Sequence, residues 1–134
     1  MTKVDWSVRY PRPLLDKLGV KDGARVSLIA VPDPGFAKRL AERTEDVSTR
    51  PRKDSDLIFY GVESPRDLDR LDALRPNLKP AGAIWVLRVK GDAAVVKETN
   101  VIAAAKRQGL VDIKVVSFSD THSALKLVIP LHLR

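Results

Sequence analysis

His122 is the residue in this chain best suited to proton transfer, because an imidazole titrates near neutral pH. Its neighbours are polar, with Asp120 and Thr121 before it and Ser123 after it, in a segment that we expect to be the loop of a hairpin. From there the imidazole could serve as a general base. The sequence has no Ser-His-Asp spacing and no nucleophile-elbow motif. The interpretation that we favour is therefore a solvated loop histidine.

Thiol chemistry is excluded and a metal site is not predicted. The chain has no cysteine, so it can form no disulfide, thiolate nucleophile or thiolate metal site. His132 is the only histidine besides His122, which makes a zinc site improbable. Glu63 and Asp54 do not form a recognisable pair of catalytic carboxylates. We accordingly predict no metal and no cofactor.

A second group of residues is defined by positive charge. The chain carries 24 Lys and Arg against 17 Asp and Glu, a net charge of +7, and such a surface can attract phosphates. The basic residues of the predicted patch are Lys38, Arg39, Arg43, Arg50, Arg52 and Lys53. No aromatic residue is interleaved with them to stack on bases. A solvated surface is the ordinary interpretation, and a nucleic-acid interface is the alternative.

Helical and strand patterns alternate along the chain. Leu57-Ile58-Phe59-Tyr60 is the clearest buried strand, with apolar residues in a row before Gly61. Helices are expected over residues 11–18, from the Asp33 cap to 43, from the Ser64 cap through Leu68, Leu71 and Leu74, and over 93–108 after an Asp92 cap. Further strands are expected over residues 25–31, 46–48, 83–89, 112–118 and 125–131.

These elements predict the fold and the place of its ligand site. The last two strands are too close for a helical crossover, so they should be antiparallel, whereas the earlier alternation predicts a mostly parallel sheet. We expect a three-layer α/β domain over residues 1–134, with helices on both faces of the sheet. Such sheets bind ligands at the carboxyl ends of their strands. The residues expected there are Asp33, Gly35, Gly61, Glu63, Ser64, Lys90, Asp120, Thr121 and Ser123.

Three sequence segments carry a family resemblance. Residues 18–26 (LGVKDGARV), residues 78–82 (LKPAG) and the terminal hairpin resemble the methyltransferase-like Rossmann fold over nearly the whole chain. Little chain separates the first strand from Leu57, which implies a shortened version of that fold. Residues 109–115 (GLVDIKV) and 120–126 (DTHSALK) also resemble a family of small bacterial proteins known only as a domain of unknown function. That family usually has tryptophan where this chain has His122, and glycine where it has Ala124, and it implies no activity.

The loop after the first expected strand departs from the methyltransferase pattern. A methyltransferase has a glycine-rich loop there so that the backbone can approach S-adenosylmethionine. In this chain Pro32 and Pro34 have no N–H to donate, and Asp33 puts a negative charge at the start of the helix. Gly35 is the only glycine of this turn. We therefore predict that cofactor binding is lost.

The favoured hypothesis is a non-catalytic methyltransferase-like domain that binds a protein partner or small ligand at the carboxyl ends of the strands. One alternative is an enzyme using the same crevice, dependent on S-adenosylmethionine or not, with His122 as acid or base. The other is a nucleic-acid-binding module. No apolar run approaches the roughly 18 residues of a membrane span, so we expect a cytoplasmic protein with no membrane contact. Its edge strands would permit a homodimer.

Overall fold

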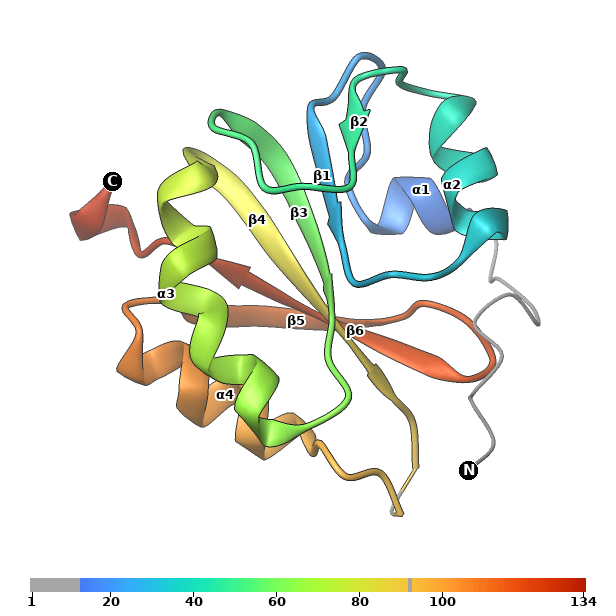
Figure 1. The fold of residues 1–134 in the computed structure, drawn as a ribbon. Helices are drawn as coiled ribbons and strands as arrows, with labels where there is room; N and C mark the ends of the chain where they lie inside the picture. The colour runs from blue at the N-terminus through green and yellow to red at the C-terminus, as the bar shows by residue number, and fades with distance from the viewer. Residues whose placement is uncertain (1–12, 92) are drawn as a thin grey trace.

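The computed structural model describes residues 13–91 and 93–134, in which six strands form one sheet (Figure 1). The strands are β1 (Val26–Ile29), β2 (Val47–Ser48), β3 (Ser55–Gly61), β4 (Leu78–Val89), β5 (Val111–Ser117) and β6 (His122–Val128). The α-helices are α1 (Leu14–Lys17), α2 (Pro34–Ala41), α3 (Leu71–Leu74) and α4 (Glu98–Arg107). Three short 3₁₀-helices are η1 (Pro65–Arg70), η2 (Arg75–Asn77) and η3 (Leu131–Leu133). The expected helix start at Pro11 and the expected Asp92 cap lie outside the described residues.

The strand order is β2-β1-β3-β4-β6-β5. Strands β2, β1, β3 and β4 are parallel to one another. Strand β6 is antiparallel to both β4 and β5, so it is the reversed strand and lies second from the edge. The predicted mostly parallel sheet and the antiparallel C-terminal hairpin are both confirmed.

Helices cover both faces of the sheet, which gives the three predicted layers. Figure 1 shows α1 and α2 on one face and α3 and α4 on the other. The alternation along β3 explains why its apolar run is continuous: Phe59 belongs to the core under α1 and α2, whereas Ile58 and Tyr60 belong to the core under α3 and α4. A strand buried on both faces needs apolar side chains at every position.

Strand β4 begins five residues before the expected start at 83, because a bulge precedes its regular part. Ser55 pairs with Leu78, and the next register pair joins Leu57 to Ala83, so residues 79–82 project from the ladder. Pro80 is accommodated because a bulge does not require its missing N–H. A Cβ on Gly82 would lie 2.7 Å from the Asp56 carbonyl oxygen. Glycine is therefore required where the bulge packs against β3.

The structure corrects two other element boundaries. The last strand covers 122–128 in place of 125–131, because a tight turn brings the N–H groups of Phe118 and Ser119 to the His122 carbonyl oxygen, each at 3.1 Å. His122 is consequently the first residue of a strand and not a loop residue. Helix α4 begins at Glu98 and not at Ala93, because the Asn100 side chain accepts the Lys97 N–H at 2.8 Å and so caps the helix at this point.

Candidate functional site at the carboxyl edge

The loops after β1, β3 and β4 meet the turn before β6, and we call this border of the sheet the carboxyl edge. Val89 at the end of β4 pairs with His122 at the start of β6, and the Lys90 N–H donates to the Thr121 carbonyl oxygen at 3.0 Å. The reversed direction of β6 therefore brings its first residues beside the ends of the parallel strands. This topology unites sequence segments that lie far apart.

Asp33 ends the first of these loops and is almost fully buried, with 2% of its surface exposed. Its Oδ1 accepts a hydrogen bond from the Phe36 N–H at 3.0 Å, which makes Asp33 the N-cap of α2. The predicted cap is confirmed. The carboxylate satisfies a helix N–H that would otherwise have no partner and faces the positive end of the helix.

Aromatic side chains fill the interior beside this loop. Phe36 packs edge-on against Phe59 of β3, with ring centroids 5.0 Å apart, and against Phe118 of the β5–β6 turn at 4.7 Å. All three side chains are fully buried. These rings join the elements that form the carboxyl edge, so the loop after β1 is fixed by the core as well as by its cap.

His122 is 1% exposed, which contradicts the favoured interpretation of a solvated loop histidine. Its Nδ1 lies 2.8 Å from the Thr121 Oγ1. Burial, opposed by the Asp33 charge and reinforced by the Lys90 charge, lowers the pKa of His122 to about 4. The imidazole is therefore neutral at physiological pH. The expectation from the sequence that His122 titrates near neutral pH is wrong.

The remaining polar groups of the turn bond largely to one another. The Ser119 Oγ accepts hydrogen bonds from the N–H groups of Thr121 and His122 at 3.3 and 3.1 Å. The Lys90 Nζ lies 2.6 Å from the Ser117 Oγ. Ser123, the next residue of β6, is 8% exposed. Most of these groups stabilise the turn, and Lys90 is the half-buried cation at its margin.

The loop after β3 contributes mainly backbone. Gly61 is the buried last residue of β3. The N–H groups of Glu63 and Ser64 both donate to the Asp67 Oδ2, at 2.8 and 3.1 Å, which fixes the entry to η1. Glu63 and Asp120 are exposed, and Gly35 and Lys90 are partly exposed. The predicted residues therefore divide into a buried interior and an exposed rim.

The predicted basic patch also divides. Arg43 forms an ion pair with Asp16 at 2.7 Å and donates to the Val20 carbonyl oxygen at 2.8 Å. Arg52 pairs with Asp46 at 2.6 Å, and hydrogen bonds from Arg52 and Arg25 lower the pKa of the Asp46 carboxyl. These two arginines hold loops together. The exposed residues Lys38, Arg50 and Lys53, with half-buried Arg39, are those left to carry nucleic-acid binding, which stays a prediction.

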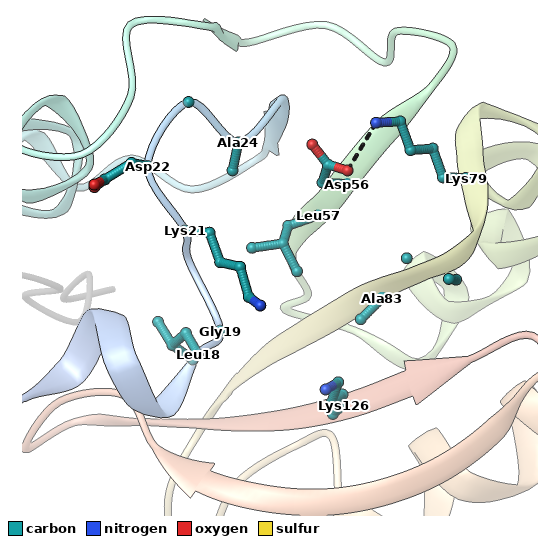
Figure 2. A pocket seen from close by; sticks show the side chains of 13 residues that line it. Leu18, Gly19, Lys21, Asp22, Ala24, Asp56, Leu57, Lys79, Ala83 and Lys126 are labelled. Carbon is teal, nitrogen blue, oxygen red and sulfur yellow. Dashed lines mark ion pairs between the residues drawn. The ribbon is translucent and has the colours of Figure 1, made fainter.

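A cavity at the opposite border of the sheet was not anticipated. It has a volume of about 340 Å³ and lies where β1 and β3 begin and β4 bulges, the border that we call the amino edge (Figure 2). Its lining residues are Leu18, Gly19, Lys21, Asp22, Gly23, Ala24, Asp56, Leu57, Lys79, Ala81, Gly82, Ala83 and Lys126. The turns at Lys21-Asp22-Gly23 and Pro80-Ala81-Gly82 were visible in the sequence, but nothing indicated that they face each other.

Solved structures with a similar fold include methyltransferases. A SAM-dependent methyltransferase from Aquifex aeolicus aligns with a TM-score of 0.69 and 14% sequence identity, over 91% of each chain. The chain has a methyltransferase-like fold. Fibrillarin from Aeropyrum pernix, solved with natively bound S-adenosyl-L-methionine, aligns with a TM-score of 0.62 and 12% identity over 81% of this chain and 68% of that one. A SAM-dependent O-methyltransferase from Thermotoga maritima aligns with a TM-score of 0.60 and 15% identity over 92% and 67% of the two chains.

At these identities the methyltransferase-like fold is what the chain shares with its neighbours. The chain spans about two thirds of the fibrillarin and of the O-methyltransferase and 91% of the Aquifex protein, and a shortened version of the fold stays a prediction. No family model and no curated protein sequence matches the chain, so the resemblance to a bacterial family of unknown function stays a prediction. Among the described residues, no group of three His, Asp or Glu could hold a metal ion, and no helix is long and apolar enough to cross a membrane.

Proposed function

We propose that this domain binds a protein partner or small ligand at its carboxyl edge and does not transfer methyl groups. The observation that carries the proposal is the Asp33 carboxylate, which is buried at the start of α2 and accepts the Phe36 N–H. Asp33 occupies the helix end at which a methyltransferase-like fold would place a glycine-rich cofactor loop.

Three properties of this loop oppose a bound cofactor. Pro32 and Pro34 offer no N–H, and the N–H of Phe36 is already used by Asp33. The buried carboxylate places negative charge where an anionic group of a ligand would otherwise meet the positive helix end. The Phe36 ring is held within the core, so the loop cannot open without exposing it to water.

The rim of the carboxyl edge remains suited to recognition. Glu63 and Asp120 are exposed carboxylates, and Lys90 is a half-buried cation near them in the fold. Charges of both signs on separate loops favour a polar partner whose groups complement them. Conversely, the buried His122 and Asp33 would contribute rigidity and not direct contacts.

A thermal-shift titration with S-adenosylmethionine and S-adenosylhomocysteine tests the loss of the cofactor site. We expect no shift at millimolar ligand, whereas a ligand at about 100 times its dissociation constant stabilises a protein by roughly 2.7 kcal/mol. The Aeropyrum fibrillarin is a suitable positive control. A dose-dependent rise in melting temperature would overturn the proposal.

The binding part of the proposal needs a separate test. A compound that stabilises the domain in a ligand screen should lose that effect in the Lys90→Ala variant and keep it in Lys106→Ala. Lys106 lies on α4, which covers the opposite face of the sheet from Asp33 and α2, and is exposed. Equal stabilisation of both variants would place the ligand elsewhere.

One observation favours an enzyme as the second candidate. The neutral His122 imidazole lies 2.8 Å from the Thr121 hydroxyl, and Asp33 acts on it electrostatically. An imidazole and a carboxylate arranged in this way can move a proton from a hydroxyl group. If the domain catalyses a reaction through this group, its pH–rate profile must change in His122→Ala. A profile indifferent to that substitution removes the candidate.

A further inference from the structure

The amino-edge cavity is built by four separate segments. The loop between α1 and β1 forms one wall, the start of β3 a second and the β4 bulge a third, while Lys126 of β6 reaches it from below in Figure 2. Its apolar surface comes from Leu18, Leu57 and Ala83. A volume of about 340 Å³ is at the lower end of the range for small-molecule sites.

Three lysines line the cavity, and one of them is neutralised. The Lys79 Nζ lies 2.9 Å from the Asp56 Oδ1. The other oxygen of that carboxylate accepts the Arg25 N–H at 2.8 Å, so Asp56 is fully engaged. Its pKa is lowered by these hydrogen bonds although burial opposes the shift. Asp56 therefore has little capacity to neutralise a second lysine.

Lys21 and Lys126 are the two cations left over. Within residues 13–91 and 93–134, neither ammonium group lies within ion-pair distance of a carboxylate. Figure 2 shows Lys21 extending over the middle of the cavity, while the Asp22 side chain points away from it. Lys21 and Asp22 both also line a neighbouring hollow that includes Asp16 and Arg43. The centre of the cavity is therefore positively charged.

Lys126 interrupts the pattern of β6. On the same face of the strand, Ala124 and Val128 are buried in the core. Lys126 pairs in register with Trp85, and its Nζ lies 5.8 Å from the Trp85 ring centroid. Burial and then the neighbouring Lys114 charge lower the pKa of Lys126. The Trp85 ring partly stabilises the ammonium, but burial of a cation without a counter-charge still has a cost, and a bound anion would relieve both effects on the pKa.

Two walls of the cavity, the α1–β1 loop and the β4 bulge, are held in place by contacts with the sheet. The Trp85 indole N–H donates to the Leu18 carbonyl oxygen at 3.0 Å, which ties the α1–β1 loop to the sheet. Gly82 packs so closely on β3 that a Cβ would lie 2.7 Å from the Asp56 carbonyl oxygen. The two lysines are thus presented from fixed backbone, on either side of an apolar surface.

We propose that the amino-edge cavity binds a phosphate monoester, with its phosphate between the ammonium groups of Lys21 and Lys126 and its organic part on Leu18, Leu57 and Ala83. Two unpaired cations match a phosphate monoester, which carries a charge of about −1.5 to −2 at neutral pH. Lysine is a common phosphate ligand, and the apolar surface accounts for a compact organic group. This site is separate from the carboxyl edge.

Isothermal titration calorimetry with adenosine 5′-monophosphate, ribose 5-phosphate, inorganic phosphate, adenosine and succinate tests the proposal. We expect one or both phosphate monoesters to bind more tightly than inorganic phosphate, and adenosine and succinate not to bind. The two monoesters distinguish a nucleotide from a sugar phosphate. Absence of binding by both monoesters at millimolar concentration would overturn the proposal, as would equal binding of succinate.

Matched variants locate the bound ligand. Lys126→Met and Lys21→Met remove a charge but keep a long side chain, and each should weaken binding about tenfold or more. Lys106→Met removes an exposed lysine from α4 and should leave the affinity unchanged. Retained affinity in both cavity variants would overturn the proposal. Circular dichroism melts confirm folding, and because Lys21 lies on an exposed loop its variant remains informative if Lys126→Met unfolds.

Discussion

The carboxyl edge and the amino edge of the sheet differ in the burial of their polar residues. At the carboxyl edge, Asp33 and His122 are 2% and 1% exposed, and the hydrogen bonds and pKa shift there belong to a closed interior. At the amino edge, Lys21 and Lys126 face a cavity and have no carboxylate partner among the described residues. In this molecule the border at which the fold usually binds ligands is packed, and the opposite border is open.

The largest expected effect of a substitution is at the carboxyl edge. Phe36→Ala removes a fully buried ring that contacts Phe59 and Phe118, and should lower the free energy of unfolding by about 3–5 kcal/mol. Urea denaturation measures this change. Val95→Ala is the control, because Val95 is 69% exposed and should change stability by less than about 0.5 kcal/mol. A loss below about 1 kcal/mol for Phe36→Ala would mean that the aromatic cluster does not close this edge.

His122 should make the closed edge sensitive to acid. Its folded-state pKa is about 4, below the ordinary histidine pKa of 6.5, so the unfolded chain binds a proton first as the pH falls. The stabilising contribution of the neutral imidazole is complete above pH 6.5 and is lost between pH 6.5 and 4, amounting to about 3 kcal/mol.

Denaturation of the wild type and of His122→Asn across that range measures this contribution. The variant lacks the titrating group and should show a shallower dependence of stability on pH. Identical slopes for the two proteins would contradict the burial of a neutral histidine at the carboxyl edge.

At the amino edge, a substitution in the β4 bulge should also lower stability. Gly82→Ala places a methyl group 2.7 Å from the Asp56 carbonyl oxygen, so β3 or the bulge must shift, at a cost of about 1–3 kcal/mol. Chemical denaturation gives the value, with Ala81→Ser at the exposed neighbouring position as the control. If Gly82→Ala were as stable as the wild type, the cavity wall would be more adaptable than its packing indicates.

The smallest effect on stability is expected for Lys126→Met. Because the Lys126 ammonium is half-buried without a carboxylate partner, its removal should lower the free energy of unfolding by no more than about 0.5 kcal/mol. Thermal and urea denaturation in ligand-free buffer would measure it. A loss of 2 kcal/mol or more would make this lysine a structural residue and remove the contrast between the two edges.

The sequence predicted the layers of the fold better than the state of the site. The apolar run in β3 and the short connection before β6 were enough to predict a mostly parallel sheet with a terminal hairpin, because both follow from local patterns. The convergence of Lys90, Thr121 and Asp33 followed from the topology. The burial of His122 did not, since it depends on the register of the last hairpin, which a tight turn at 118–121 moves by three residues.

The aromatic cluster and the amino-edge cavity could not be predicted, because both depend on contacts between segments that are distant in the sequence. Phe36, Phe59 and Phe118 lie in three different elements, and their edge-on packing has no sequence signature. The amino-edge cavity likewise requires Lys21 of the α1–β1 loop and Lys126 of β6 to line the same cavity. A lysine between the core positions Ala124 and Val128 was the available signal, and it pointed to this border only once the strand's register was known.

Strand β5 has a consequence for self-association. It is an edge strand of the sheet and exposes the apolar side chains of Val111, Ile113 and Val115. An exposed apolar edge strand can ordinarily pair with a strand of a second chain. A register shift between Asp112 and Lys114 bends the strand at its middle, and these two charged residues flank the bend. Irregular backbone of this kind resists strand addition. The protein can therefore keep an apolar border in water, and any homodimer is expected to form through side chains and not by continuation of the sheet.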